Sequence, residues 1–292
     1  MQSKPILEFK KQRELGDILT DAFNFIKFEF KPFFGTLLKI VGPYLFTTMV
    51  FLGLYFYAFN DVFSLDVYGQ DAIVNPVIML IAVFGLIISA IAMYALTQAT
   101  VLYYVKSYID TNGQPDYLTI RKAAYAKFWS FVGLSFLVGL VLVVGFMLCF
   151  IPGIYLYPPL MLSFSILVFM EKDVTESFSY GFTLIKDHWW ITFAALLVLG
   201  IIIAVIGYIF QIPAVIYLWV KMGVFSGEMD AESMGGVFDP VYIILNLLAY
   251  MVQFILQTVS LVAAALIFFN LNERKNFTGT MERIQNLGSK ED

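Results

Sequence analysis

Residues 241–269, VYIILNLLAYMVQFILQTVSLVAAALIFF, contain no charged side chain. An α-helix rises 1.5 Å per residue, so about 20 apolar residues cross the roughly 30 Å of hydrocarbon in a bilayer. This segment is therefore long enough to span a membrane with some tilt. Five further segments are similarly apolar, at about 34–58, 76–105, 129–150, 153–170 and 190–219.

The composition agrees with these segments. Hydrophobic residues make up 60% of the 292 residues and charged residues make up 14%. Soluble domains average about 45–50% and about 25%, respectively. This excess of apolar side chains excludes a secreted domain, a nucleic-acid-binding protein and an ordinary cytosolic enzyme. It predicts an all-α membrane protein with about six transmembrane helices.

The positive charges predict the orientation of the chain. Lys and Arg number six in residues 1–32, four in 106–128, two in 171–189 and four after residue 270, which is sixteen of the 18 in the chain. These segments lie on one side of the predicted membrane. Cytoplasmic loops are enriched in Lys and Arg. We therefore expect a multi-pass protein with both termini in the cytoplasm.

The segment before the first span has helical periodicity. Its apolar positions are Leu15, Ile18, Leu19, Ala22, Phe23 and Ile26, and polar residues fill the other face. This pattern is typical of an amphipathic helix that lies in the membrane interface. We expect that helix to end at Lys31-Pro-Phe-Phe34. The predicted organisation is an interfacial segment over residues 1–32, a membrane domain over 33–270 and a cytoplasmic tail over 271–292.

Two of the spans are interrupted. In the fourth, Pro152, Pro158 and Pro159 lie where a helix should begin, and a proline in a helix interior removes a hydrogen bond. A helix beginning only at Pro158 would reach about 20 Å by Met170, so this segment either crosses fully in part-irregular form or forms a short hairpin with the third. In the fifth span, Pro213 predicts a kink or an early end near Gln211.

A similar string occurs twice at an offset of 155 residues. Asp21-Ala-Phe-Asn-Phe25 corresponds to Glu176-Ser-Phe-Ser-Tyr180, and Lys31-Pro-Phe-Phe34 corresponds to Lys186-Asp-His-Trp-Trp190. One interpretation is an internal repeat of an interfacial helix followed by two spans. The other is generic anchoring, because lysine and aromatic side chains are favoured at any cytoplasmic interface.

The sixth span carries a polar stripe. Asn246, Gln253 and Gln257 share one helix face, and Gln98 and Gln211 in other spans are candidate partners. Such amides either join helices through hydrogen bonds or line a path for a solute. No acidic residue falls within a predicted span. That absence counts against ion-coupled transport.

Several side chains are predicted to contact lipid headgroups. They are Lys31, Lys39, Lys127, Lys186, Trp129, Trp189 and Trp190, all near a predicted cytoplasmic boundary. Lys39 is the one ionisable residue inside a predicted span, about 8 Å from its start. Its side chain can extend to the headgroups, contact a lipid phosphate or take part in transport.

The chain contains few of the residues and motifs that are typical of enzyme active sites. Cys149 is the single cysteine and His188 the single histidine, so no cysteine cluster or multi-histidine metal site can form. No phosphate-binding loop or hydrolase motif is present. We therefore expect no cofactor, no metal and no enzymatic activity.

The stretch from Ile151 to Trp190 resembles a known family. Pro152-Gly-Ile-Tyr155, Glu171, Glu176-Ser-Phe and Lys186 before Trp189-Trp190, together with the opening Arg13-Glu-Leu-Gly-Asp-Ile-Leu-Thr-Asp-Ala-Phe23, are similar to the membrane domain of bacterial glycerophosphoryl diester phosphodiesterases and its stand-alone relatives. The resemblance implies a six-span helical fold in a bacterial cytoplasmic membrane. It does not imply phosphodiesterase activity, which belongs to a separate soluble domain.

These observations predict a non-catalytic integral membrane protein, a scaffold or partner subunit in envelope or lipid homeostasis. Its expected partners are membrane lipids and other membrane proteins, and no nucleic acid. The alternative is a transporter or permease for an apolar or lipid-like solute. An enzyme acting on membrane lipids is the least favoured hypothesis.

Overall fold

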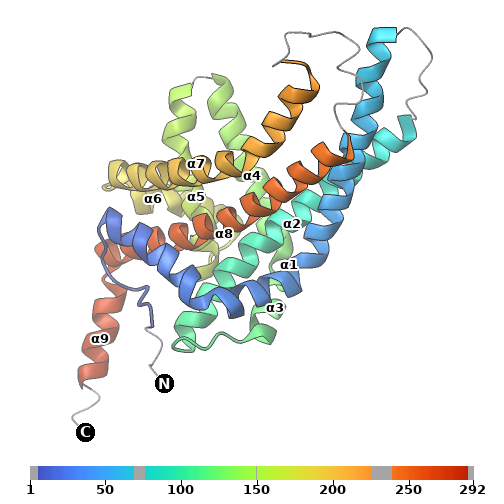
Figure 1. Ribbon diagram of the computed structural model, residues 1–292. Coiled ribbons are helices and arrows are strands. Elements are labelled where there is room, and N and C mark those ends of the chain that lie inside the picture. Colours follow the sequence, from blue (N-terminus) through green and yellow to red (C-terminus); the bar gives the residue numbers. More distant parts are fainter. Residues whose placement is uncertain (1–5, 69–75, 149, 225–238, 289–292) are drawn as a thin grey trace. The chain divides into compact units, whose positions relative to one another are not determined.

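A computed structural model describes residues 6–68, 76–148, 150–224 and 239–288. Within these residues the chain is helical and contains no β-strand (Figure 1). The helices are α1 (Leu15–Tyr68), α2 (Pro76–Asp110), α3 (Tyr117–Ala126), α4 (Phe128–Leu148), α5 (Phe150–Phe169), α6 (Val174–Ile185), α7 (Trp189–Lys221), α8 (Pro240–Asn276) and α9 (Thr278–Gly288).

Six of these helices, α1, α2, α4, α5, α7 and α8, are long and apolar enough to cross a membrane. Large apolar side chains such as Phe46, Phe84 and Tyr208 are exposed on them. Contiguous apolar surface of this kind is rare on a soluble monomer. The prediction of an all-α membrane protein with about six transmembrane helices is confirmed.

The chain divides into two compact units. Unit 1 comprises the residues up to Ile40, Ala95–Ile201 and the residues from Thr258 onward, and unit 2 comprises Val41–Tyr94 and Ile202–Gln257. Helices α1, α2, α7 and α8 each contribute to both units. This interleaved division differs from the consecutive one expected from the sequence.

Two helical segments form the core of unit 1. Residues 95–105 of α2 and 261–273 of α8 are buried on almost every side. The start of α1 covers this core with a stripe of buried side chains: Ile18, Ala22, Phe25, Ile26, Glu29, Phe33 and Leu37. Their spacing of three and four residues places them on one helix face.

Helix α1 does not end at Pro32. It continues from Leu15 to Tyr68, so the expectation that a helix ends at Lys31-Pro-Phe-Phe34 is wrong. Pro32 lacks only the N–H that would bond the Phe28 carbonyl, and it is exposed. Packing of the residues on both sides of it against unit 1 is enough to keep the helix continuous.

Helices α4 and α5 form a hairpin, and α6 packs along α5 (Figure 1). Helix α5 begins at Phe150 and contains Pro158 and Pro159 in its interior, so residues 151–157 are helical and the whole helix is long and apolar enough to cross a membrane. Gly181 of α6 lies against this interior, where an added Cβ would be 2.4 Å from the Pro159 carbonyl oxygen. Glycine therefore permits the close approach of α6 to α5.

Proline also explains how α7 begins. Pro159 has no N–H, so the Tyr155 carbonyl four residues earlier loses its helical donor. The indole N–H of Trp189, the first residue of α7, donates to that carbonyl at 3.0 Å. This hydrogen bond joins the start of α7 to the first half of α5.

Unit 2 is packed through small residues and a few polar pairs. An added Cβ at Gly85 of α2 would lie 2.3 Å from the ring of Phe51 of α1, so this ring packs directly on the glycine backbone. Helix α7 continues through Pro213 to Lys221. The expected early end near Gln211 is therefore not observed.

The hydrogen bond between Trp189 and Tyr155 can be tested with a double-mutant cycle. Trp189→Phe leaves the carbonyl unpaired and should lower the free energy of unfolding by about 1–3 kcal/mol. In a Pro159→Ala background the new backbone N–H can bond the carbonyl, so the same change should cost clearly less. Denaturant titration of the detergent-solubilised protein measures both values.

Trp190→Phe is the matched control, because the indole N–H of Trp190 donates no hydrogen bond to a residue that the structure describes. Equal losses for Trp189→Phe in both backgrounds would show that the proline does not create the need for the indole donor.

Candidate functional site

The most elaborate polar site lies in unit 1, around the segment before α1. We call residues 6–14 the strap. Arg13 is buried at its end, and its guanidinium donates to Asp21 Oδ2 at 2.8 Å and to the Phe9 and Lys11 carbonyls at 2.7 and 3.3 Å. It also donates to the Glu8 carbonyl. One side chain thus folds the strap onto α1.

The end of α8 holds the strap from a second side. Asn270 Oδ1 accepts the backbone N–H of Arg13 at 2.8 Å, and the Arg274 guanidinium donates to the Arg13 carbonyl at 3.3 Å. Arg274 also donates to Asn270 Oδ1 at 3.4 Å. The backbone of Arg13 is therefore paired in both directions by α8.

Phe9 fixes the middle of the strap in the core. Its ring lies edge-on to Phe25, Tyr108 and Phe269, with centroid distances of 5.3, 6.1 and 5.8 Å. Such edge-to-face pairs contribute about 0.5–1.5 kcal/mol each beyond area burial. The backbone N–H of Leu7 donates to the Tyr108 hydroxyl at 3.0 Å. The strap is thus an ordered part of unit 1.

Glu273 connects the end of α8 to α9. Its carboxylate is buried and accepts the backbone N–H groups of Gly279 and Thr280 at 2.6 and 2.9 Å, and the Thr280 hydroxyl at 2.6 Å. This cap satisfies N–H groups that a helix start leaves unpaired. An added Cβ at Gly279 would lie 2.4 Å from the Lys10 carbonyl oxygen, so the strap crosses the start of α9 at glycine.

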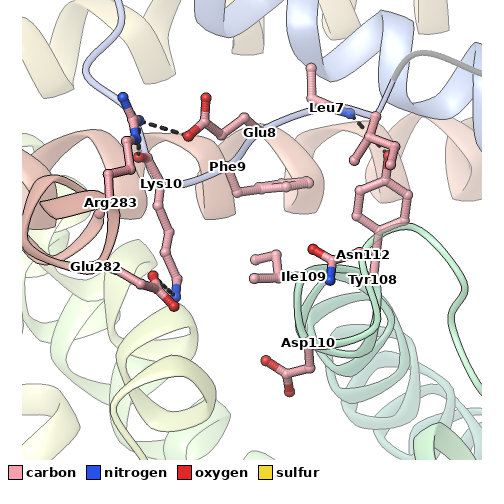
Figure 2. A pocket seen from close by; sticks show the side chains of 12 residues that line it. Leu7, Glu8, Phe9, Lys10, Tyr108, Ile109, Asp110, Asn112, Glu282 and Arg283 are labelled. Carbon is pink, nitrogen blue, oxygen red and sulfur yellow. Dashed lines mark hydrogen bonds and ion pairs between the residues drawn. The ribbon is translucent and has the colours of Figure 1, made fainter. Parts of the chain in front are cut away.

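The strap, the end of α2 and α9 enclose a cleft of about 550 Å³, shown in Figure 2. Lys10 Nζ lies 2.7 Å from Glu282 Oε2, and an Arg283 guanidinium nitrogen lies 2.7 Å from Glu8 Oε1. Both pairs are exposed, so each contributes little to stability. Among the described residues, no group of three or more His, Cys, Asp or Glu side chains could hold a metal ion.

Helix α9 presents an apolar stripe beside this cleft. Met281 and Ile284 are 58% and 59% exposed, and a spacing of three residues places them on one helix face. Phe277 directly precedes α9, with a φ of 52°, and is also 52% exposed. These residues belong to the segment 271–292 that the sequence predicts to be a cytoplasmic tail. Helix α9 is held at its start while its apolar face is uncovered in the described part of the chain.

Two carboxylates outside the spanning helices have lowered pKa values. The hydroxyl and backbone N–H of Thr119 bond Asp116 at the start of α3 and lower the pKa of its carboxyl. Lys106 Nζ lies 2.5 Å from Glu171 Oε1 and lowers the pKa of that carboxyl through a hydrogen bond and its charge. Both groups are exposed and act at connections between helices.

The predicted polar stripe is only partly assembled. Gln211 Nε2 donates to Asn246 Oδ1 at 2.9 Å, and Asn246 Nδ2 donates to the Tyr242 carbonyl at 2.9 Å. Gln253 is exposed and, with Gln211, lines a cleft of about 300 Å³ in unit 2. Gln257 is half-buried. Gln98 belongs to unit 1, where its buried amide has no hydrogen-bond partner among the described residues.

The structure contains a buried carboxylate that the sequence analysis placed outside every span. Glu29 is buried on the inner stripe of α1, and the Tyr104 hydroxyl donates to its Oε2 at 2.9 Å. The helix that contains it reaches from Leu15 to Ala58, and Glu29 precedes the segment at about 34–58 that the sequence predicts to cross the membrane. The signal was present, because Glu29 continues the spacing of Phe25 and Phe33.

The predicted headgroup contacts all lie in unit 1. Lys31, Lys39, Lys127 and Lys186 are exposed, as are Trp129 and Trp190, whereas Trp189 is half-buried. Lys39 Nζ lies 5.3 Å from the ring centroid of Tyr117, a cation–π contact. Trp189 and Lys186 line a further groove with residues of α5.

The sequence analysis did not identify Arg13, Asn270 or Glu273. Each is polar in a segment that sequence patterns assign to a loop, a helix end or a tail. A buried role was signalled only for Asn270, which follows an unbroken apolar run. Comparison with known protein families, with curated proteins and with solved structures finds no match. The resemblance to the phosphodiesterase membrane domain therefore stays a prediction.

The amide pair can be tested by substitution. Asn246→Leu removes the bond to Gln211 between α7 and α8 and should lower the free energy of unfolding by about 0.6–2 kcal/mol. Gln253→Leu is the control on the same helix, and it should change stability by less than about 0.5 kcal/mol. Detergent-resolved unfolding followed by circular dichroism measures both, and equal effects would contradict the assignment of Asn246 as a helix-joining residue.

Proposed function

We propose that this chain is a non-catalytic scaffold or partner subunit of envelope or lipid homeostasis in the cytoplasmic membrane of a bacterium. Both termini lie in the cytoplasm in this proposal. The strap and α9 then form a docking platform that faces the cytoplasm, and a second membrane or peripheral protein binds there.

The uncovered apolar face of α9 carries the proposal. A helix whose exposed apolar residues share one face is a common means of docking into a groove of another protein, and Met281 and Ile284 form such a face on α9. Disordered segments lose affinity because they must be ordered on binding. Glu273 and the strap hold the start of α9 beforehand, so a partner that binds Phe277, Met281 and Ile284 avoids part of that cost.

The charge distribution supports the orientation. The strap and α9 contain Lys10, Arg13 and Arg283, and the connection between α2 and α4 contains Arg121, Lys122 and Lys127. An excess of Lys and Arg near the ends of spans favours the cytoplasmic side. The docking platform is therefore assigned to the cytoplasm.

A transporter is the second candidate, and one observation favours it. Gln253 and Gln211 line a cleft within unit 2, on helices that are otherwise apolar. A polar lining at such depth is typical of a solute path. Asn246, however, has both amide atoms engaged in hydrogen bonds. The Asn246 side chain therefore joins α7 to α8 and is not free to bind a solute.

The docking platform is tested with charged substitutions on α9. Met281→Asp combined with Ile284→Asp places two charges on the apolar face, and partner proteins cross-linked to the full chain in intact cells should fall at least tenfold. Quantitative mass spectrometry of the cross-linked products measures the change. Gln285→Asp on the same helix is the matched control, because Gln285 is exposed and lies outside the stripe.

An unchanged set of cross-linked proteins in the double variant would contradict the scaffold. Membrane insertion and helix content are measured for each variant, so that loss of fold is separated from loss of docking. Solute flux in vesicles is measured with Asn246, Gln253 and Gln257 changed to Leu, and its loss together with unchanged cross-linking would favour the transporter.

A further inference from the structure

A groove of about 670 Å³ lies in unit 1 between the start of α5 and the start of α7. Residues 151, 154 and 155 contribute from α5, and residues 186–191 and 193 contribute from the connection and α7. Sites for single small ligands have volumes of about 300–1,000 Å³. The groove therefore has the size for one ligand molecule and is small for a protein interface.

One wall of the groove is a stack of aromatic rings. Trp189 lies between Tyr155 and Phe193, with centroid distances of 5.4 and 5.1 Å and interplanar angles of 18° and 9°. The bond from its indole N–H to the Tyr155 carbonyl fixes the ring in this position. The wall is thus formed before any ligand binds, which lowers the entropic cost of binding.

The groove is open to an apolar surface on one side. Trp190 is 77% exposed and Ile151 is 74% exposed. Tryptophan is enriched where hydrocarbon meets headgroups. A ligand that enters from the bilayer can therefore place an apolar chain against the aromatic wall.

Charged groups also line the groove. Lys186 is exposed and forms no ion pair with a residue that the structure describes. A free ammonium next to an apolar wall suits an amphipathic ligand with a phosphate group. Asp187 and His188 lie beside it, so the rim also offers an acceptor for a donor on the same ligand.

A second proline of α5 leaves another backbone carbonyl without its helical donor. Pro158 has no N–H, so the carbonyl of Ile154, four residues earlier, has no helical donor. Ile154 itself lines the groove. A hydroxyl or ammonium group of a ligand can fill that role, as the indole of Trp189 does for the next carbonyl along α5.

We infer that this groove binds one glycerophospholipid, with an acyl chain along the Tyr155–Trp189–Phe193 wall and the phosphate at Lys186. The headgroup carries a hydrogen-bond donor, as in phosphatidylglycerol or phosphatidylethanolamine. This inference deepens the proposed function, since it names the lipid class that the membrane subunit holds, but it does not depend on the docking platform of α9.

The test uses the full chain in mild detergent and measures bound lipid by native mass spectrometry during titration with phosphatidylglycerol, phosphatidylethanolamine or phosphatidylcholine. One lipid should bind with a defined affinity, and Lys186→Gln should weaken it at least tenfold. Lys127→Gln is the matched control, because Lys127 is an exposed lysine near the exposed Trp129 but does not line the groove. It should change affinity less than twofold.

Fluorescence then locates the lipid. In a Trp129→Phe, Trp219→Phe background only Trp189 and Trp190 emit, and phosphatidylglycerol with brominated acyl chains should quench them with saturation at one lipid per chain. Quenching that rises without saturation, or equal losses of affinity in the Lys186 and Lys127 variants, would overturn the site. Equal binding of phosphatidylcholine would overturn the requirement for a headgroup donor.

The same preparations separate this inference from the proposed function. Lys186→Gln should leave the proteins cross-linked through α9 unchanged, whereas Met281→Asp with Ile284→Asp should leave lipid binding unchanged. Loss of one property without the other identifies which of the two proposals has failed.

Discussion

A backbone carbonyl that is buried without a hydrogen-bond partner is costly, and this constraint explains the most specific contacts in the molecule. The Tyr155 carbonyl loses its helical donor to Pro159 and gains the indole of Trp189. The carbonyls of Phe9, Lys11 and Arg13 lie outside any helix and are bonded by Arg13 and Arg274. In each case a side-chain donor takes the place of the missing backbone donor. The bond holds the strap, or the start of α7, in position.

A buried guanidinium is costly unless it is fully paired, and removal of one partner of a buried ion pair costs about 3–5 kcal/mol. Arg13 has five N–H donors, and its bonds reach Asp21 and three backbone carbonyls. The strap is therefore coupled to α1 and, through Asn270 and Arg274, to α8. Displacement of the strap would leave the Arg13 guanidinium and several backbone carbonyls without partners. We therefore expect the strap to stay packed against α1 and α8.

The sequence was sufficient to predict the helical membrane fold, because the six spans can be recognised from the length and apolar composition of their segments alone. It was insufficient for the ends of helices. Pro32 and Pro213 predict breaks, yet α1 and α7 continue through them because residues on both sides pack against other helices. A proline removes one local hydrogen bond of known cost, whereas the packing that offsets it involves residues far away in the chain. The same reason explains Glu29, whose partner Tyr104 lies on another helix.

The two similar strings at Asp21 and Glu176 take different structures, and this difference favours generic anchoring over an internal repeat. The first string lies within one continuous helix, α1, whereas residues 186–188 of the second separate α6 from α7. Asp21 pairs with the buried Arg13, but Glu176 is exposed and pairs with Lys172 at 3.5 Å. A duplicated unit would be expected to retain its local contacts. Lysine beside aromatic residues is instead the composition that an interface selects in any helix that reaches it.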